Sequence, residues 1–177
     1  MMRRTGKVVL AGIVLAMLSG CTAPDPIRTA ESVDLPRFMG DWYVIANIPT
    51  FIEQGAHNAI ESYRLNDDGS VATTFTFKQD AFDGEQKLYQ ATGFVLDHKS
   101  NAVWGMQFLW PFRADYRIVY VDEAYTQTII GRLKRDYVWI MARSPHLSDE
   151  QFAKLLEIVK AEGYDLSAIR RVPQRWE

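Results

Sequence analysis

The chain has 177 residues, of which 47% are hydrophobic and 24% are charged, and its formal net charge is −2. This length suits one domain of ordinary size, and the hydrophobic content is sufficient for a buried core. The weak negative charge argues against a nucleic-acid partner, because such partners require a basic surface. The single cysteine excludes a disulfide within the chain, so the core has to supply the stability.

The first twenty residues predict an export signal. Arg3, Arg4 and Lys7 precede an apolar stretch, 8–18, that is too short to span a membrane as a stable anchor. The stretch ends in Leu18-Ser19-Gly20-Cys21, which resembles the lipobox of bacterial lipoproteins. The resemblance implies that Cys21 receives the lipid and becomes the mature N-terminus. The alternative is an ordinary secretory peptide with an incidental cysteine.

The lipobox divides the chain into a signal peptide over 1–20, a lipidated tether over 21–34 and a folded domain over 35–177. The tether is expected to be a linker because it is polar and contains two prolines. Cleavage removes three cations and no acid, which changes the net charge from −2 to −5. Thr22, after the lipidated position, implies sorting to the outer membrane, where several acyl chains together anchor firmly.

From residue 41 onward the sequence predicts strands joined by short turns. Several segments alternate apolar and polar residues, and the sequences Asn66-Asp67-Asp68-Gly69 and Asp83-Gly84 predict hairpin turns. Successive hairpins favour an all-β fold, an eight-stranded antiparallel up-and-down β-barrel without exposed edges. A two-sheet sandwich is the alternative that strand counting leaves open. The predicted strands are 42–48, 57–65, 70–79, 86–96, 102–110, 115–122, 125–133 and 137–143.

One α-helix is predicted after the strands. Ser148 and Gln151 form a capping box at its start, and Gly163 supplies a C-terminal stop. Between them, apolar residues recur at helical spacing from Phe152 to Val159. This stripe needs an apolar partner, so the helix is expected to pack on the outside of the barrel.

Two residues at the ends of the strand series carry a family resemblance. Gly40 permits a tight backbone entry to the first strand, Trp42 follows it, and Arg143 ends the last strand. Together with the lipobox and the C-terminal helix, this pattern resembles the lipocalin family, in its bacterial outer-membrane lipoprotein branch, over about 35–172. The resemblance implies that Arg143 packs over Trp42 and closes the barrel floor, with Gly40 beside them.

The resemblance has one departure. The second motif of the family, usually Thr-Asp-Tyr, is present only as Asp122-Glu123-Ala124-Tyr125. The turn between the sixth and seventh strands is therefore not predicted in detail.

Alternation predicts which side chains point into the barrel. The inward faces combine aromatic rings with several tyrosine hydroxyls, which suits an acyl chain with a polar head. From the pattern alone these side chains could equally fill the interior, and it is the resemblance that favours a ligand cavity. Trp110 is expected to share the inward face of its strand. The expected ligand-binding residues are Glu61, Tyr63, Phe75, Phe77, Tyr89, Trp104, Met106, Phe108, Tyr116, Ile118, Tyr120, Tyr137, Trp139 and Met141.

Glu61 is the one acidic residue in this set, and the resemblance to the lipocalin family implies that it points inward. A carboxylate inside an apolar barrel is costly unless it is paired or protonated. Glu61 is therefore expected either to contact a ligand head group or to lie near the mouth, in water or beside a basic side chain.

The sequence predicts neither a reaction centre nor a metal or cofactor site. His57, His98 and His146 lie in separate predicted segments and lack the spacing of metal ligands. No glycine-rich phosphate loop or serine nucleophile motif is present. These absences favour a binding protein over an enzyme.

The resemblance implies a carrier of a small hydrophobic ligand, a fatty acid or lysophospholipid. The expected location is the outer membrane, with a lipid-anchored barrel that faces the periplasm and serves lipid carriage, storage or envelope maintenance under stress. One alternative is a structural or docking lipoprotein with a filled barrel, and another is a lipid-modifying enzyme on the same scaffold. The sequence neither requires nor excludes a homodimer.

Overall fold

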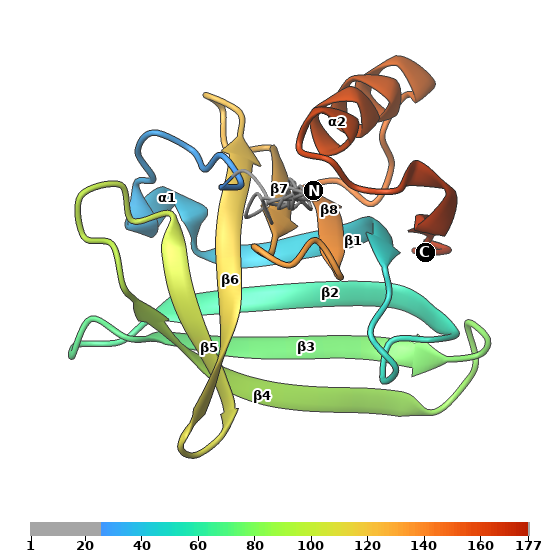
Figure 1. Ribbon diagram of the computed structural model, residues 1–177. Helices are drawn as coiled ribbons and strands as arrows, with labels where there is room; N and C mark the ends of the chain where they lie inside the picture. The colour runs from blue at the N-terminus through green and yellow to red at the C-terminus, as the bar shows by residue number, and fades with distance from the viewer. Residues whose placement is uncertain (1–25, 177) are drawn as a thin grey trace, which may run out of the picture.

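The computed structural model describes residues 26–176, and its strands form a closed antiparallel barrel (Figure 1). Each strand pairs with its neighbour in the chain, and β1 also pairs with both β8 and β2, which closes the barrel. This closure confirms the eight-stranded barrel and excludes the sandwich. The strands are β1 Gly40–Ile48, β2 Ala56–Leu65, β3 Val71–Gln79, β4 Gln86–Val95, β5 Val103–Leu109, β6 Phe112–Val121, β7 Gln127–Gly131 and β8 Val138–Ala142.

Two strands differ from the prediction by more than a residue or two. β6 begins at Phe112 instead of 115, because the turn occupies only Trp110 and Pro111. β7 begins at Gln127, later than predicted, because the Asp122 carboxylate accepts hydrogen bonds from the backbone N–H groups of Thr126 and Gln127 and keeps Thr126 in the preceding turn.

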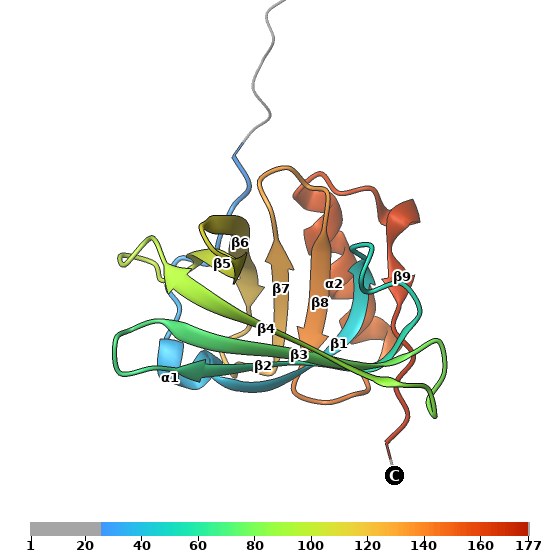
Figure 2. The ribbon, with the colours of Figure 1, turned by 90° about the horizontal axis from the view of Figure 1, so that it is seen from below.

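The predicted helix is confirmed as α2, Asp149–Ala161. The Ser148 hydroxyl accepts a hydrogen bond from the backbone N–H of Gln151, and the Gln151 side chain accepts one from the backbone N–H of Ser148. Leu155 and Val159 are buried in a cluster with residues of β1, β7 and β8. Figure 2 shows α2 beside β8, outside the barrel. None of the helices within residues 26–176 is long and apolar enough to cross a membrane.

The described part of the predicted tether is not a free linker. Ile27 and Val33 are buried, at 4% and 1% exposure, and the Val33 N–H donates to the Ser100 carbonyl. Arg28 forms an ion pair of 2.6 Å with Glu162, just beyond α2. The prediction of a linker up to Asp34 is therefore wrong for residues 26–34. The signal peptide, Cys21 and the rest of the tether lie outside the described residues.

Three short elements were not predicted. Helix α1, Leu35–Phe38, precedes β1, and the 3-10 helix η1, Leu166–Ala168, follows α2. Strand β9, Arg170–Arg171, pairs with Ala46 and Asn47 of β1. Beyond β9 the chain lies between β1 and β2 where these strands separate. There the Asn58 N–H donates to the Pro173 carbonyl, and the Gln174 side chain donates to backbone carbonyls of both strands.

Candidate functional site

One end of the barrel, here called the floor, is closed by the predicted pair. The Arg143 guanidinium lies 3.8 Å above the centre of the Trp42 ring, and Trp42 is fully buried. The Trp42 indole donates to the Phe38 carbonyl. The Arg143 guanidinium donates to four backbone carbonyls, those of Arg37, Phe38, Met39 and Asp41, at 2.7–3.0 Å, and to a fifth, that of Tyr125, at 3.4 Å. One cation thus ties α1 and the start of β1 to the end of β8.

Gly40 is required at the floor for two reasons. Its φ of +92° favours glycine, and a Cβ there would lie 3.3 Å from a guanidinium nitrogen of Arg143. Both the backbone conformation and the close approach of Arg143 therefore select against a side chain at this position.

Above the floor, four aromatic rings form a layer between Trp42 and the interior. Phe38 and Trp104 are fully buried and Tyr63 is nearly so, with the Phe38 ring centre 5.5 Å from Tyr63 and 5.7 Å from Trp104. Trp104 stacks on Tyr116 at 5.5 Å, and the hydroxyls of Tyr63 and Tyr116 share a hydrogen bond. Two of the predicted ligand-binding residues, Tyr63 and Trp104, therefore build the base of the interior instead of lining its open space.

The interior holds a cavity of about 420 Å³. This volume falls in the range of small-molecule sites, and most of the lining is apolar. Its opening, here called the mouth, lies at the end of the barrel opposite the floor, on the side of the β1–β2, β3–β4, β5–β6 and β7–β8 connections. The lining residues are Thr50, Phe51, Ile52, Glu53, Glu61, Thr73, Phe75, Tyr89, Ala91, Met106, Phe108, Ala114, Asp115, Tyr116, Arg132 and Trp139.

Half of the predicted ligand-binding residues line this cavity. Of the others, Tyr137 is half-buried next to Trp139 and Arg132. Phe77, Ile118 and Met141, like Tyr63 and Trp104, are buried in the inner core around the cavity. The predicted residues that line the cavity are Glu61, Phe75, Tyr89, Met106, Phe108, Tyr116 and Trp139.

Tyr120 does not point inward as predicted. It packs against the outer cluster under α2, together with Val119, whereas Ile118 belongs to the inner core. The reason is a β-bulge in the pairing of β6 with β7 between Ile118 and Tyr120. A bulge adds one residue to a strand and so reverses the faces of the residues beyond it.

The mouth carries exposed apolar side chains. Phe51 in the β1–β2 loop is 83% exposed, and Trp110 in the β5–β6 turn is 80% exposed. Their neighbours Phe108, Leu109 and Phe112 are 60–72% exposed. The expectation that Trp110 points into the barrel is therefore wrong: the inward face of β5 ends before the turn. An apolar patch of this kind marks an interaction surface more often than a chance cluster does.

Glu61 lies on the cavity wall, opposite Trp42 in the pairing of β1 with β2. Burial raises the pKa of its carboxyl to about 8, a nearby carboxyl at Glu53 adds to the rise, and a hydrogen bond with Tyr63 opposes it. Burial also raises the pKa values of Tyr63 and Tyr116 well above the ordinary range. At neutral pH these three side chains are therefore mostly uncharged. The protonated form of Glu61 avoids the free-energy cost of a buried carboxylate inside the barrel.

The sequence interpretation missed the polar residues near the mouth. Glu53 is buried, accepts hydrogen bonds of 2.7 Å from the Trp139 indole and the Thr50 N–H, and has its pKa raised by burial. Asp115 and Arg132 also line the cavity. Glu53 lies in a loop without periodicity, so no alternation could assign its direction.

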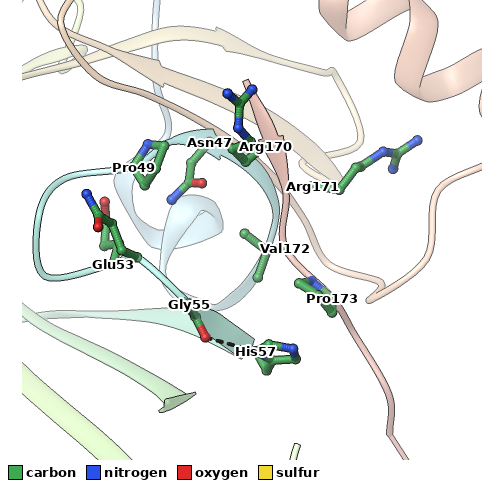
Figure 3. A pocket seen from close by; sticks show the side chains of 11 residues that line it. Asn47, Pro49, Glu53, Gly55, His57, Arg170, Arg171, Val172 and Pro173 are labelled. Atoms are coloured by element: carbon green, nitrogen blue, oxygen red, sulfur yellow. Dashed lines mark hydrogen bonds between the residues drawn. The ribbon is translucent and has the colours of Figure 1, made fainter. Parts of the chain in front are cut away.

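A second hollow, of about 360 Å³, lies beside β9 on the outside of the barrel (Figure 3). Arg170, Arg171 and Pro173 lie on one side of it. Glu53 lines both this hollow and the interior cavity. The His57 ring forms a hydrogen bond with the Gly55 carbonyl. Within residues 26–176 no three His, Cys, Asp or Glu side chains gather as metal ligands.

Comparisons with known proteins agree with this geometry. Residues 33–174 match the family described as "Lipocalin-like domain". Outer membrane lipoprotein Blc of Escherichia coli K12 is 26% identical over 94% of this chain and 96% of its own length. Temperature-induced lipocalin-1 of Arabidopsis thaliana is 27% identical over 86% of each chain.

Solved structures show the same architecture. Insecticyanin from the tobacco hornworm Manduca sexta superimposes with a TM-score of 0.67, at 15% identity over 88% of this chain and 86% of its own. The cockroach allergen Per a 4 gives a TM-score of 0.63 at 18% identity, over 84% and 92%. A closed barrel with an apolar cavity and this floor is suited to binding a small hydrophobic ligand. From its sequence match and its fold, the chain belongs to the lipocalin family.

Proposed function

We propose that this lipocalin binds a fatty acid or a lysophospholipid in the barrel cavity. The observation that carries the proposal is the cavity itself, whose 420 Å³ are lined mainly by apolar side chains with polar groups near both ends. Such an interior suits a single acyl chain with a polar head. An open cavity also disfavours the alternative of a docking lipoprotein with a filled barrel. The residues proposed to contact the ligand are the seven predicted residues that line the cavity. Among them, Trp139 is the fluorophore that should report binding.

The proposed location is the outer membrane, with the barrel anchored through a lipid on Cys21 and facing the periplasm. Two observations support it: the lipobox in the sequence and the similarity to proteins named outer membrane lipoprotein. The exposed apolar residues around the mouth support an exchange of lipid with a membrane. The proposed role is carriage or storage of envelope lipids, or maintenance of the envelope under stress.

A fluorescence titration tests the binding. The mature chain, residues 21–177 with Cys21→Ser, is titrated with palmitate and with palmitoyl lysophosphatidylcholine. We expect saturable one-to-one quenching or a blue shift that is lost in Trp139→Phe, because the Trp139 ring lines the cavity. Trp104→Phe is the matched control, because Trp104 lies in the base of the interior and should keep the signal. A folded, ligand-free protein that responds to neither lipid would contradict the proposal.

The anchor is tested separately by labelling cells with radioactive palmitate. The wild-type protein should take up label, and Cys21→Ala should not. Equal labelling of the two, or none in the wild type, would remove the lipid anchor and leave the binding proposal untouched.

The position of Glu61 defines a third test. A Glu61 carboxyl that contacts a head group should make Glu61→Gln weaken binding of one head group more than of another. Equal affinities of wild type and Glu61→Gln for acidic and zwitterionic lipids would show that Glu61 does not select the ligand.

A further inference from the structure

Arg132 is the one basic residue among those that line the cavity within the described chain. It follows Gly131, the last residue of β7, and so lies at the mouth end of the wall. Its Nε is buried and has no hydrogen-bond partner. Its nearest acid is Asp136, at a long 3.4 Å between Nη1 and the carboxylate, and the Tyr137 ring centre lies 5.2 Å away. A buried cationic donor left unpaired costs free energy, which a ligand oxygen can recover.

The acidic side chains of the same cavity already have partners. Asp115 pairs with Arg117 at 2.9 Å and accepts from the Leu133 N–H. Glu53 accepts from Trp139 and Thr50, as described above. Glu61, farther from the mouth, is mostly protonated at neutral pH because burial raises its pKa to about 8. The cavity therefore has, at its mouth, the Arg132 guanidinium with an unused Nε donor. The acidic side chains of the cavity are all paired or protonated, so none of them is available to that donor.

We propose that Arg132 is the head-group site of the cavity and that it binds the oxyanion of a single-chain amphiphile. The oxyanion is a carboxylate or a phosphate ester, and the acyl chain extends from Arg132 past Phe75 and Met106 toward the base of the interior. This inference rests on the proposed function, since it assigns the orientation of a ligand in the same cavity.

The chemistry follows from the guanidinium group. Its planar set of N–H donors matches two oxygens of one oxyanion, and hydrogen bonds between charged groups are stronger than neutral ones. The present contact with Asp136 is long, and that carboxylate is about one-third exposed, so water already satisfies much of it. Binding would exchange a weak ion pair for a shorter, less hydrated one and would satisfy Nε.

The test compares ligands that share a chain and differ in the head. Palmitate, palmitoyl lysophosphatidylcholine and the uncharged monopalmitoylglycerol are titrated against the mature chain with Cys21→Ser, with and without Arg132→Gln, by Trp139 fluorescence. We expect Arg132→Gln to weaken palmitate, lysophosphatidylcholine or both by about tenfold to a hundredfold, and monopalmitoylglycerol by less than about twofold. Loss for only palmitate or only lysophosphatidylcholine shows whether the oxyanion is a carboxylate or a phosphate ester.

Arg113→Gln is the matched control, because Arg113 lies at the same end of the barrel with its guanidinium over Phe94, away from the cavity lining. It should leave all three affinities unchanged. An equal loss for all three ligands in Arg132→Gln would assign Arg132 a structural role, and no loss would remove it from the site. Either result overturns the inference, while binding of palmitate or lysophosphatidylcholine by the wild type upholds the proposed function. Failure of the wild type to bind either palmitate or lysophosphatidylcholine overturns the proposed function itself.

A second variant keeps the inference testable if Arg132→Gln does not fold. Asp136→Asn removes the acid that competes for the guanidinium, so it should tighten binding of the oxyanion-bearing ligand, palmitate or lysophosphatidylcholine, by about two- to fivefold. It should not affect monopalmitoylglycerol. Unchanged or weaker binding of the oxyanion-bearing ligand in Asp136→Asn would contradict the proposed geometry.

Discussion

Replacement of Glu61 by glutamine should stabilise the ligand-free barrel, and more so as the pH rises. The folded state raises the pKa of this carboxyl from its ordinary 4.5 to about 8, chiefly because burial disfavours the charge. Between these values the unfolded chain has released the proton and the folded chain retains it. Ionisation of Glu61 in the unfolded state therefore lowers the free energy of unfolding as the pH rises from 4.5 to 8. This loss of stability, the Glu61 penalty, reaches its full value above pH 8.

The magnitude follows from the shift. Each pKa unit corresponds to about 1.4 kcal/mol, so the penalty is about 3 kcal/mol at pH 7. Glutamine has a similar shape and does not titrate, so Glu61→Gln should be free of this term. The difference in unfolding free energy between Glu61→Gln and wild type should grow by about 3 kcal/mol from pH 5 to pH 8.

The assay is urea unfolding of the ligand-free mature chain at pH 5, 6, 7 and 8, followed by circular dichroism. The informative quantity is how the difference in unfolding free energy between Glu61→Gln and wild type changes with pH. Contributions from other titrating groups, and from the small change in side-chain shape, largely cancel in that quantity. Glu157→Gln, on the exposed side of α2, is the control and should run parallel to wild type. If the unfolding free energies of wild type and Glu61→Gln also change in parallel with pH, the reasoning is refuted, and Glu61 stays ionised in the folded barrel.

Three further substitutions test the floor and the aromatic layer above it by urea unfolding. Arg143→Met should destabilise the barrel by about 3 kcal/mol, because four backbone carbonyls lose a charged donor; a loss below about 1 kcal/mol would show that water replaces it. Gly40→Ala should cost about 1–3 kcal/mol through its positive φ and the approach of Arg143, and a neutral result would contradict that strain. Trp104→Ala should cost about 3–5 kcal/mol by leaving a cavity in the layer; a smaller cost would mean that neighbouring rings refill the space.

The sequence was sufficient for the parts of the site that depend on regular strands. Alternation placed Phe75, Tyr89 and Trp139 on the cavity wall because successive side chains of a strand point to opposite sides. It failed at Tyr120, where a bulge reverses the faces, and at Trp110, where the strand ends in a turn. Neither a bulge nor the last paired residue has a reliable mark in one sequence.

The sequence also could not predict how deep within the barrel a given side chain lies. Trp104 and Phe75 share an inward direction, yet one builds the base of the interior and the other lines the cavity. This difference depends on barrel tilt and on Phe38 of α1, which packs against Trp104 from outside the strand series. Glu53 and Arg132 come from connections between strands, so only the folded chain could bring them to the cavity.

The sequence by itself determined the series of antiparallel strands and the outer helix, and its resemblance to a family implied the pair that closes the floor. The strands and the helix depend on local causes: hairpin turns between alternating strands and a capping box at Ser148. The tertiary structure decided which inward residues leave open space and how residues 26–34 and the C-terminal segment pack. It also decided the protonation of Glu61 and the unpaired donor of Arg132. Burial, desolvation and pairing are sums over neighbours distant in the chain, and they exist only once the barrel has closed.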